Sequence, residues 1–244
     1  MSFTIITLIP SLQNTNGDAE NAAVLAARAR WAGHEASVVA VETPADLPEQ
    51  VDAVVLGSGS DSSLDAARAA LLPFHDDLRR WGTEGVPILS VGTGWELLSW
   101  GIELANGHVV EGLGILPGRA VTGDGERRIG DLVIRSPRFG RLVGFENHAR
   151  DYLQAEASPL GRTQAGAGNG RGSGQEGVVM GNVFGTHLHG PVLAKNPAFA
   201  DALLTEMAGR AGVAYAPGAQ AAEVDGYAHA ARSSQLRAAG LDTD

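Results

Sequence analysis

The first hundred residues alternate between short apolar runs and stretches with helical spacing. The apolar runs cover residues 3–9, 37–41, 51–56 and 87–91, and helical patterns follow the first, third and fourth of them. Strands that alternate with helices form parallel βαβ units, and near-continuous apolar strands belong to a sheet covered on both faces. The pattern predicts an α/β fold with a mostly parallel central sheet flanked by helices.

The two main helices expected between these strands have recognisable ends. The first covers residues 21–31, with Asp18 as its N-cap and Gly33 as its C-terminal stop. The second covers residues 64–81 and contains Pro73, which we expect to kink it.

The pattern changes after residue 107, where short strands separated by glycine and proline turns replace the βα units. This β-rich half either extends the central sheet or adds a second one. A loop with six glycines covers residues 164–177, a helix runs from Pro197 to residue 211, and an Ala-rich helix covers residues 221–240. The expected strands are residues 108–116, 119–122, 128–134, 142–145, 178–180 and 182–190.

Composition excludes several classes of protein. The net charge is -10 and no cluster of Lys and Arg is present, so we expect no nucleic-acid partner. No apolar run approaches the roughly 20 residues of a membrane span. The N-terminus has no basic stretch ahead of its apolar residues, so we expect a cytoplasmic protein. The absence of cysteine excludes disulfides, thiolate metal sites and thiol catalysis.

Residues 87–98 combine a buried strand, a tight glycine turn and the start of a helix near Trp95. This order is typical of a nucleophile elbow, which presents one side chain on a strained backbone above the carboxyl edge of a sheet. The nucleophile position is Gly92, which has no side chain. The sequence therefore predicts the housing of an acyl-transfer site that lacks its reactive atom.

Nearby hydroxyl groups are poor replacements for that atom. Thr93 is β-branched and resists the backbone conformation that the elbow position requires. Ser58 and Ser60 belong to a different turn, Gly57–Asp61, which we place on the other side of the cleft. That turn either brings backbone amides close to an anion or an oxyanion, or it is simply a turn that needs small residues.

Further candidate groups lie in the second half. His187 and His189 are two residues apart and lie on one face if they belong to a strand. Three roles are open to them: a metal site, a general base in the case of one of them, or structural histidines. Arg127 and Arg128 either bind a carboxylate or remain solvated. Residues 145–148, Phe-Glu-Asn-His, are either a polar part of the site or a turn.

Several of these motifs, in this order, resemble the GatD family, the glutamine amidotransferase subunit of lipid II isoglutaminyl synthase. That family is a CobB/CobQ-like branch of the class I glutamine amidotransferases. The resemblance covers about residues 3–210, and its specific elements are Phe-Glu-Asn-His and His-Gly-Pro. The motifs are Asn14-Thr15-Asn16-Gly17-Asp18, Gly57-x-Gly59-x-Asp61, the elbow, Glu111-Gly112-Leu113-Gly114-Ile115, Arg127-x-x-Gly130-Asp131, Gly144-Phe145-Glu146-Asn147-His148, Pro159-Leu160-Gly161, Gly166-x-Gly168-Asn169, Gly185-Thr186-His187-Leu188-His189-Gly190-Pro191 and Lys195-Asn196-Pro197.

The resemblance implies a single flavodoxin-like class I glutamine amidotransferase domain over residues 1–210 and a helical extension over residues 211–244. It implies a heterodimer in which this subunit hydrolyses glutamine and passes ammonia to MurT, a Mur-ligase-like partner. MurT uses ATP and Mg to amidate the D-glutamate of the lipid II stem peptide. No cofactor or metal is expected in this chain itself.

The resemblance also implies roles for individual residues. His189 takes the position of the base that activates the nucleophile, and Arg127 or Arg128 that of the substrate-binding arginine. The turn Gly57-Ser58-Gly59 matches the turn that helps to form the oxyanion hole. Thr93 and Glu96 fall at positions of the elbow that we assign to substrate binding. The acid that orients His189 is not evident, and Glu146, the partner subunit or no residue at all are the alternatives.

This chain departs from the family pattern at the reacting centre. The family elbow reads Cys-Gly-Gly-Tyr-Gln, whereas residues 92–96 read Gly-Thr-Gly-Trp-Glu, and Ser60 replaces the family's Gln beside the oxyanion turn. We expect Glu96 to disfavour a glutamine carboxylate by like charge. We therefore expect no glutaminase activity. The chain is then either an amidotransferase subunit whose ligase receives ammonia from elsewhere, or a scaffold or regulatory subunit that does no chemistry.

Overall fold

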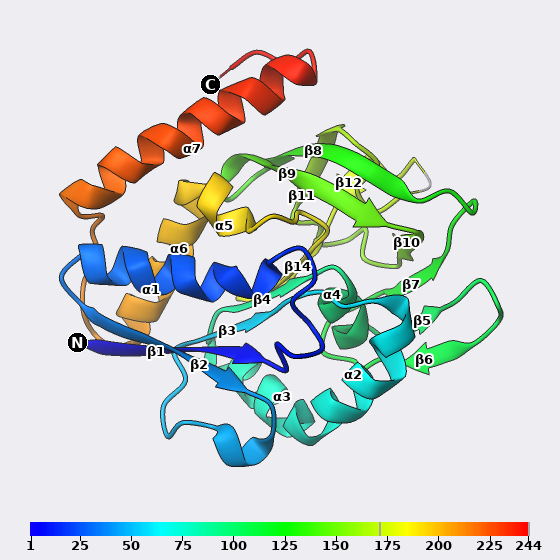
Figure 1. Ribbon diagram of the computed structural model, residues 1–244, viewed down its shortest axis with the longest axis horizontal. Coiled ribbons are helices and arrows are strands. Elements are labelled where there is room, and N and C mark those ends of the chain that lie inside the picture. The colour runs from blue at the N-terminus through cyan, green and yellow to red at the C-terminus, as the bar shows by residue number, and fades with distance from the viewer. Residues whose placement is uncertain (171, 244) are drawn as a thin grey trace.

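A six-stranded sheet forms the centre of the computed structural model, which describes residues 1–170 and 172–243 (Figure 1). Its strands run in the order β13-β14-β4-β3-β1-β2, and all neighbours are parallel except β13 and β14. The predicted α/β fold with a mostly parallel central sheet is confirmed. The strands are β1 (Ser2–Leu8), β2 (Glu35–Val41), β3 (Ala53–Leu56), β4 (Ile88–Val91), β13 (Val178–Met180) and β14 (Val183–Thr186).

Helices cover both faces of this sheet and create two apolar cores. In β3, Val54 and Leu56 face one core while Ala53 and Val55 face the other, as alternation along a doubly covered strand requires. The first core includes α2 (Leu64–Leu71), α3 (His75–Glu84) and α4 (Thr93–Leu98); the second includes α1 (Asn21–Trp31), α5 (Val192–Lys195) and α6 (Pro197–Arg210).

The second half of the chain adds two further sheets of four strands each. One has the order β10-β7-β5-β6 and the other β12-β11-β8-β9, so this half adds two separate sheets, while its strands β13 and β14 also extend the central one. The strands are β5 (Gly101–Glu103), β6 (Val109–Glu111), β7 (Arg119–Thr122), β8 (Arg128–Ser136), β9 (Gly140–His148), β10 (Arg150–Leu153), β11 (Gly161–Ala165) and β12 (Gln175–Glu176).

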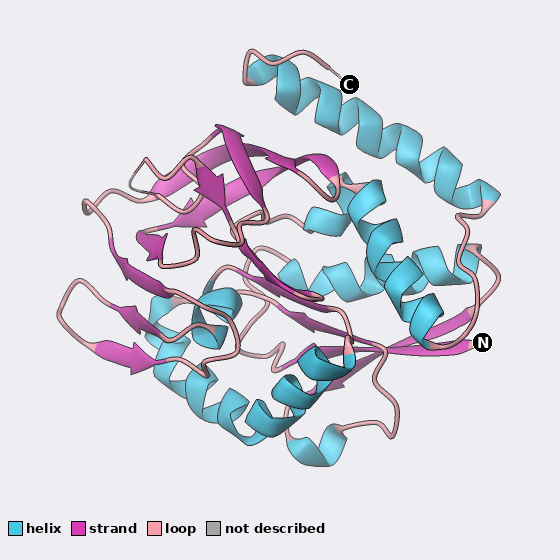
Figure 2. Cartoon of the chain, turned by 180° about the vertical axis from the view of Figure 1, so that it is seen from behind, coloured by secondary structure: helices cyan, strands magenta, loops and turns pink. Residues whose placement is uncertain are grey.

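The C-terminal helix α7 (Ala219–Ala238) lies along the outside of the molecule (Figures 1 and 2). Asp225 pairs with Arg28 of α1 at 2.6 Å, and Leu236 packs against Val133 and Val143 of the β8–β9 hairpin. The helix thus bridges the central layer and the third sheet. The boundary near residue 210 stays a prediction.

Several predicted elements change in detail. The helix expected over residues 64–81 breaks at Pro73 into α2, a short 3-10 turn and α3. The α4 helix begins at Thr93, two residues before the expected start. Residues 145–148 belong to strand β9 and are not a turn. Short elements β5, β10 and α5 were not expected, and β11 and β12 take both ends of the expected glycine-rich loop.

Two predicted segments contain residues outside the described part of the chain. These are residue 171 in the glycine-rich loop and residue 244 at the end of the extension. Within the described residues, no helix has the length and apolar character that a membrane crossing requires.

Gly185 on β14 offers a test of this packing, because a Cβ there would overlap the indole ring of Trp95. We predict that Gly185→Ala lowers the free energy of unfolding by about 1–3 kcal/mol through overpacking. Gly226→Ala is the control: nothing lies near its Cβ position inside α7, so it should stabilise the protein by about 0.5–1 kcal/mol. Urea unfolding measures both, and equal effects would contradict this packing.

Candidate active site

The turn between β4 and α4 has the geometry of a nucleophile elbow. Gly92 adopts φ 55° and ψ -126°, a conformation that residues with a Cβ rarely take. Two residues later, a Cβ on Gly94 would overlap the carbonyl oxygen of Gly57, so α4 can approach the end of β3 only with glycine there. The sharp bend that the sequence predicts is present, and its apex has no side chain.

His189 lies directly beside this apex. Its backbone exchanges two hydrogen bonds with Phe145 of β9, of 2.9 and 3.4 Å, which fix the segment after β14. A Cβ placed on Gly92 would lie 2.8 Å from Cε1 and 3.4 Å from Nε2 of the His189 ring. The structure therefore brings the predicted base and the predicted nucleophile position together, about 100 residues apart in sequence.

Asp18 is the acid that sequence reasoning did not find. Its Oδ2 lies 2.8 Å from Nδ1 of His189 and accepts a 2.5 Å hydrogen bond from the Ser58 hydroxyl. Asp18 does not cap a helix; it begins a 3-10 turn and its fully buried carboxylate points to the site. Nε2 of His189 has no hydrogen-bond partner among the described residues, and in the neutral tautomer that donates Nδ1–H to Asp18 it is the acceptor of the ring.

Glu146, the acid considered from sequence, has another role. Its carboxylate accepts hydrogen bonds of 2.8 Å from the amide of Ala167 and 2.9 Å from that of Gly168. It lies 3.5 Å from Nε2 of His148. Glu146 therefore holds the glycine-rich segment onto β9 and does not orient His189.

The turn after β3 presents its amides to the elbow. The Gly59 N–H donates a 2.6 Å hydrogen bond to the Thr93 hydroxyl, which in turn donates to Oε1 of Gln13 at 2.9 Å. A Cβ on Gly57 or Gly59 would overlap backbone atoms of residues 12 and 13, so both positions require glycine. Ser60 bonds to Ser62 and Ser63 at the outer rim.

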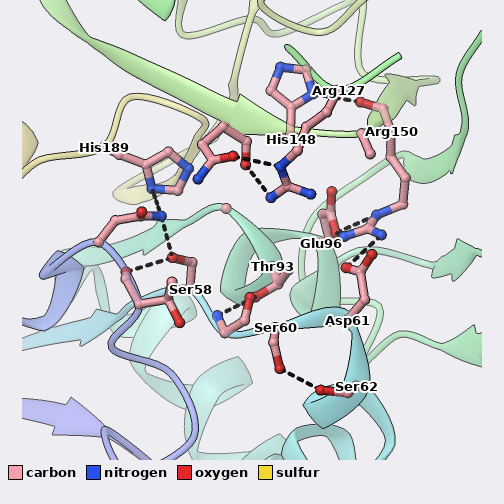
Figure 3. A pocket seen from close by; sticks show the side chains of 16 residues that line it. Ser58, Ser60, Asp61, Ser62, Thr93, Glu96, Arg127, His148, Arg150 and His189 are labelled. Atoms are coloured by element: carbon pink, nitrogen blue, oxygen red, sulfur yellow. Dashed lines mark hydrogen bonds and ion pairs between the residues drawn. The ribbon is translucent and has the colours of Figure 1, made fainter. Parts of the chain in front are cut away.

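These groups line a cavity of about 360 Å³ at the carboxyl ends of the central strands (Figure 3). His189 and Ser58 lie on one side of it, and Glu96, Arg150 and Asp61 on the other. Of the residues predicted from sequence, Gly57 and Arg128 are not among its lining residues. The lining residues are Thr15, Asn16, Ser58, Gly59, Ser60, Asp61, Ser62, Gly92, Thr93, Glu96, Arg127, Asn147, His148, Ala149, Arg150 and His189.

The structure separates the two neighbouring arginines. Arg127 lines the cavity, and Asn147 fixes it by accepting hydrogen bonds of 2.7 Å from Nε and 3.2 Å from Nη2. Arg128 pairs with Asp124 at 2.6 Å in the adjoining loop. Of these two arginines, only Arg127 lines the cavity, where its guanidinium could meet a ligand carboxylate.

Glu96 is buried and charge-compensated. Its Oε2 accepts a 2.9 Å hydrogen bond from Nε of Arg150 and forms an ion pair with Nη2 at 2.7 Å, and Arg150 also pairs with Asp61 at 2.9 Å. Burial raises the pKa of Glu96, but the charges of Arg150 and His187 outweigh it and lower this pKa to about 2. The expected repulsion of a ligand carboxylate by Glu96 is therefore offset by the guanidinium beside it, which sequence alone did not reveal.

His187 is not among the residues that line the cavity. Strand β14 ends at Thr186, so His187 and His189 do not share a strand face as expected. Its ring nitrogens lie 3.6 Å from Glu176 and 3.8 Å from Glu96, and the ring stacks on His148 at 4.0 Å. Burial lowers the pKa of His187, but the two carboxylates raise it to about 9. Among the described residues no group of three acidic, His or Cys side chains is placed to hold a metal ion.

The titration of His187 tests this arrangement. We predict that His187 stays protonated at neutral pH, with a pKa near 9, and that Glu96→Gln lowers this pKa. The folded-state pKa of His187 lies above the unfolded value of about 6.5, so the bound proton stabilises the fold. This stabilisation is fully present below about pH 6.5 and is lost as the pH rises through the folded-state pKa. Imidazole NMR measures the pKa; Asp124→Asn, at the surface, should leave it unchanged.

Removing Arg150 should expose the cost of the buried carboxylate. We predict that Arg150→Met lowers the free energy of unfolding by about 3–5 kcal/mol, because Glu96 is left buried without its main partner. Arg128→Met removes an arginine from a surface pair and should leave stability nearly unchanged. Chemical denaturation measures the free energy of unfolding of both variants. Similar decreases in the two would contradict the role of Arg150 as the main partner of buried Glu96.

Known proteins share this fold and much of this sequence. The subunit GatD of lipid II isoglutaminyl synthase (glutamine-hydrolyzing) from Staphylococcus aureus (strain N315) is 33% identical over 88% of this chain and 88% of its own length. The same subunit from Streptococcus pneumoniae (strain ATCC BAA-255 / R6) is 31% identical over 82% of this chain and 78% of its own.

Solved structures agree on the fold. PurLQS from Thermotoga maritima superposes with a TM-score of 0.55 at 17% identity, covering 78% of this chain and 88% of that one. A glutamine amidotransferase crystal structure gives a TM-score of 0.56 at 19% identity, covering 83% of this chain and 98% of that one. The family described as the CobB/CobQ-like glutamine amidotransferase domain matches residues 7–197. Because this family match covers more than half of the chain, the chain belongs to the CobB/CobQ-like glutamine amidotransferases, and its GatD relatives share most of its length.

Proposed function

We propose that this chain is the GatD-like subunit of a lipid II amidating synthase and that it does not hydrolyse glutamine itself. The relatives that support this role are named as subunits of lipid II isoglutaminyl synthase and align with most of the chain. The observation that carries the second part is Gly92, which occupies the apex of the elbow beside His189 without a reactive side chain.

No neighbouring hydroxyl group is free to replace the missing nucleophile. The Ser58 hydroxyl donates to Asp18 and lies within 2.9 Å of the Thr15 carbonyl oxygen, and the Thr93 hydroxyl donates to Gln13. Neither is paired with Nε2 of His189, which has no partner among the described residues. Loss of the nucleophile from a catalytic triad costs about 10⁶-fold in rate, so His189 and Asp18 alone should not sustain glutamine hydrolysis.

In this proposal the chemistry resides in a Mur-ligase-like partner equivalent to MurT. The partner binds ATP and Mg, amidates the D-glutamate of lipid II in the cytoplasm and takes ammonia from solution or another donor. This chain contributes a folded subunit surface to the heterodimer and needs no cofactor of its own.

A second candidate is a regulatory pseudo-glutaminase. The cavity keeps Arg127, and the pair His189–Asp18 remains intact, so the site retains groups that suit an amino acid carrying a carboxylate and an amide. In this alternative the chain binds glutamine without cleaving it and changes the activity or stability of its partner.

Activity of the co-purified complex tests the proposal. We expect the chain, co-expressed with a MurT-like ligase from the same organism, to release no ammonia from glutamine and the complex to amidate lipid II with ammonium chloride. His189→Ala should leave ammonium-dependent amidation unchanged, because no step uses that ring. Glutamine-dependent amidation that His189→Ala abolishes would overturn the proposal.

The same complex separates the two candidates. Calorimetric titration with glutamine should show no binding if the chain serves only as a subunit surface. Binding that changes ammonium-dependent amidation at least severalfold would favour the regulatory alternative. An Arg127→Gln variant is the control, since it removes the guanidinium that would hold the ligand carboxylate.

A further inference from the structure

We infer that Thr93 is a second block to acyl transfer, independent of the missing nucleophile, because its hydroxyl occupies the Gly59 amide that an oxyanion would need. The inference rests on the proposed absence of glutamine hydrolysis and gives it a second structural cause. It concerns the stabilisation of the tetrahedral intermediate, whereas Gly92 concerns only its formation.

Acyl transfer at an elbow uses two backbone donors. One is the N–H of the residue after the nucleophile, and the other comes from a neighbouring loop after a parallel strand. In this chain the first is the N–H of Thr93, in the first turn of α4, where amides have no acceptor within the helix. The loop after β3 comes close enough to supply the second, since Ser58 Cβ would lie 2.8 Å from a Cβ on Gly92.

The second donor is already bonded within the protein. The Gly59 N–H donates to Oγ1 of Thr93 at 2.6 Å, a short hydrogen bond for an amide. Thr93 is 8% exposed, and its hydroxyl donates to Oε1 of Gln13, which is fully buried. An oxyanion that displaced the hydroxyl would leave Oε1 of Gln13 without this donor.

Thr93 cannot easily turn its hydroxyl away. A β-branched side chain has restricted rotation about χ1, and one of the two alternative rotamers of Thr93 brings the methyl group into the space that the hydroxyl leaves. A methyl group at that place would cover the Gly59 amide and bond to nothing. Thr93 therefore closes the donor in the observed rotamer, which its bond to Gln13 holds, and in one of the two others, while a smaller residue without a hydroxyl would open it.

The consequence is that a thiol alone should not restore the reaction. Gly92→Cys supplies an attacking atom beside His189 but leaves the Gly59 amide occupied. Its Cβ would also lie 2.8 Å from both Ser58 Cβ and His189 Cε1, so Ser58→Gly is added to remove the first contact and to let the new side chain move away from the ring. The double variant Ser58→Gly/Gly92→Cys is the common background in which residue 93 is compared.

In that background we predict that Thr93→Ala raises kcat for glutamine hydrolysis about 10²–10³-fold, the effect of one oxyanion donor. KM should stay within about threefold, because the donor acts on the transition state and not on bound substrate. Thr93→Ser, the matched control, keeps the hydroxyl and should stay close to the background rate. Equal kcat for Thr93→Ala and the background, or for Thr93→Ala and Thr93→Ser, would overturn the inference.

Hydrogen exchange tests the same bond without any activity. In the chain with Gly92 intact, Thr93→Ala should speed exchange of the Gly59 amide at least tenfold, whereas Thr93→Ser should not. An amide that exchanges equally fast with Thr93 present would refute the inference. Glutamine hydrolysis by the unaltered chain would instead contradict the proposed function, so failure of the inference and failure of the proposed function are distinguishable.

Discussion

The close approach of two glycine turns is the constraint on which the site depends. Gly94 at the start of α4 lies against the carbonyl oxygen of Gly57 at the end of β3, and neither position has room for a Cβ. This contact aligns the elbow with the turn that carries Gly59, so that one cavity receives amides from both. The parallel pairing of β3, β4 and β14 brings their carboxyl ends to the same edge, where His189 joins them.

A buried set of charges holds the other wall of that cavity. Arg150 on β10 joins Glu96 of α4 to Asp61 after β3, and His187 after β14 lies between Glu96 and Glu176. These ion pairs connect β10 of an added sheet to groups beside the central sheet, and so fix how the two sheets are placed. Glu96, Arg150, Glu176 and His187 are buried, so removing any one of them leaves a buried partner uncompensated.

The sequence predicted the parts of this site that depend on local patterns. The alternation of β-strands with helices gave the sheet, and the glycine pair around Thr93 gave the sharp bend of the elbow. It did not predict Asp18, because a buried acid in a polar loop has the same local pattern as an N-cap. Nor did it predict the Glu96–Arg150 pair, which joins residues 54 positions apart through the packing of separate sheets. Strands such as β5 and β10 are too short for periodicity to identify.

The persistence of His189 and Asp18 does not by itself argue for retained chemistry. Asp18 accepts from both Ser58 and His189 while it is fully buried, so replacing either donor would leave a buried carboxylate with one hydrogen bond fewer. The pair therefore has a structural role that does not depend on a nucleophile at Gly92. Gly92 and Thr93 carry no such penalty, since one has no side chain and the other satisfies its own hydrogen bonds. The fold therefore requires the buried pair but requires no reactive side chain at Gly92, which agrees with the proposed role as a subunit that does not hydrolyse glutamine.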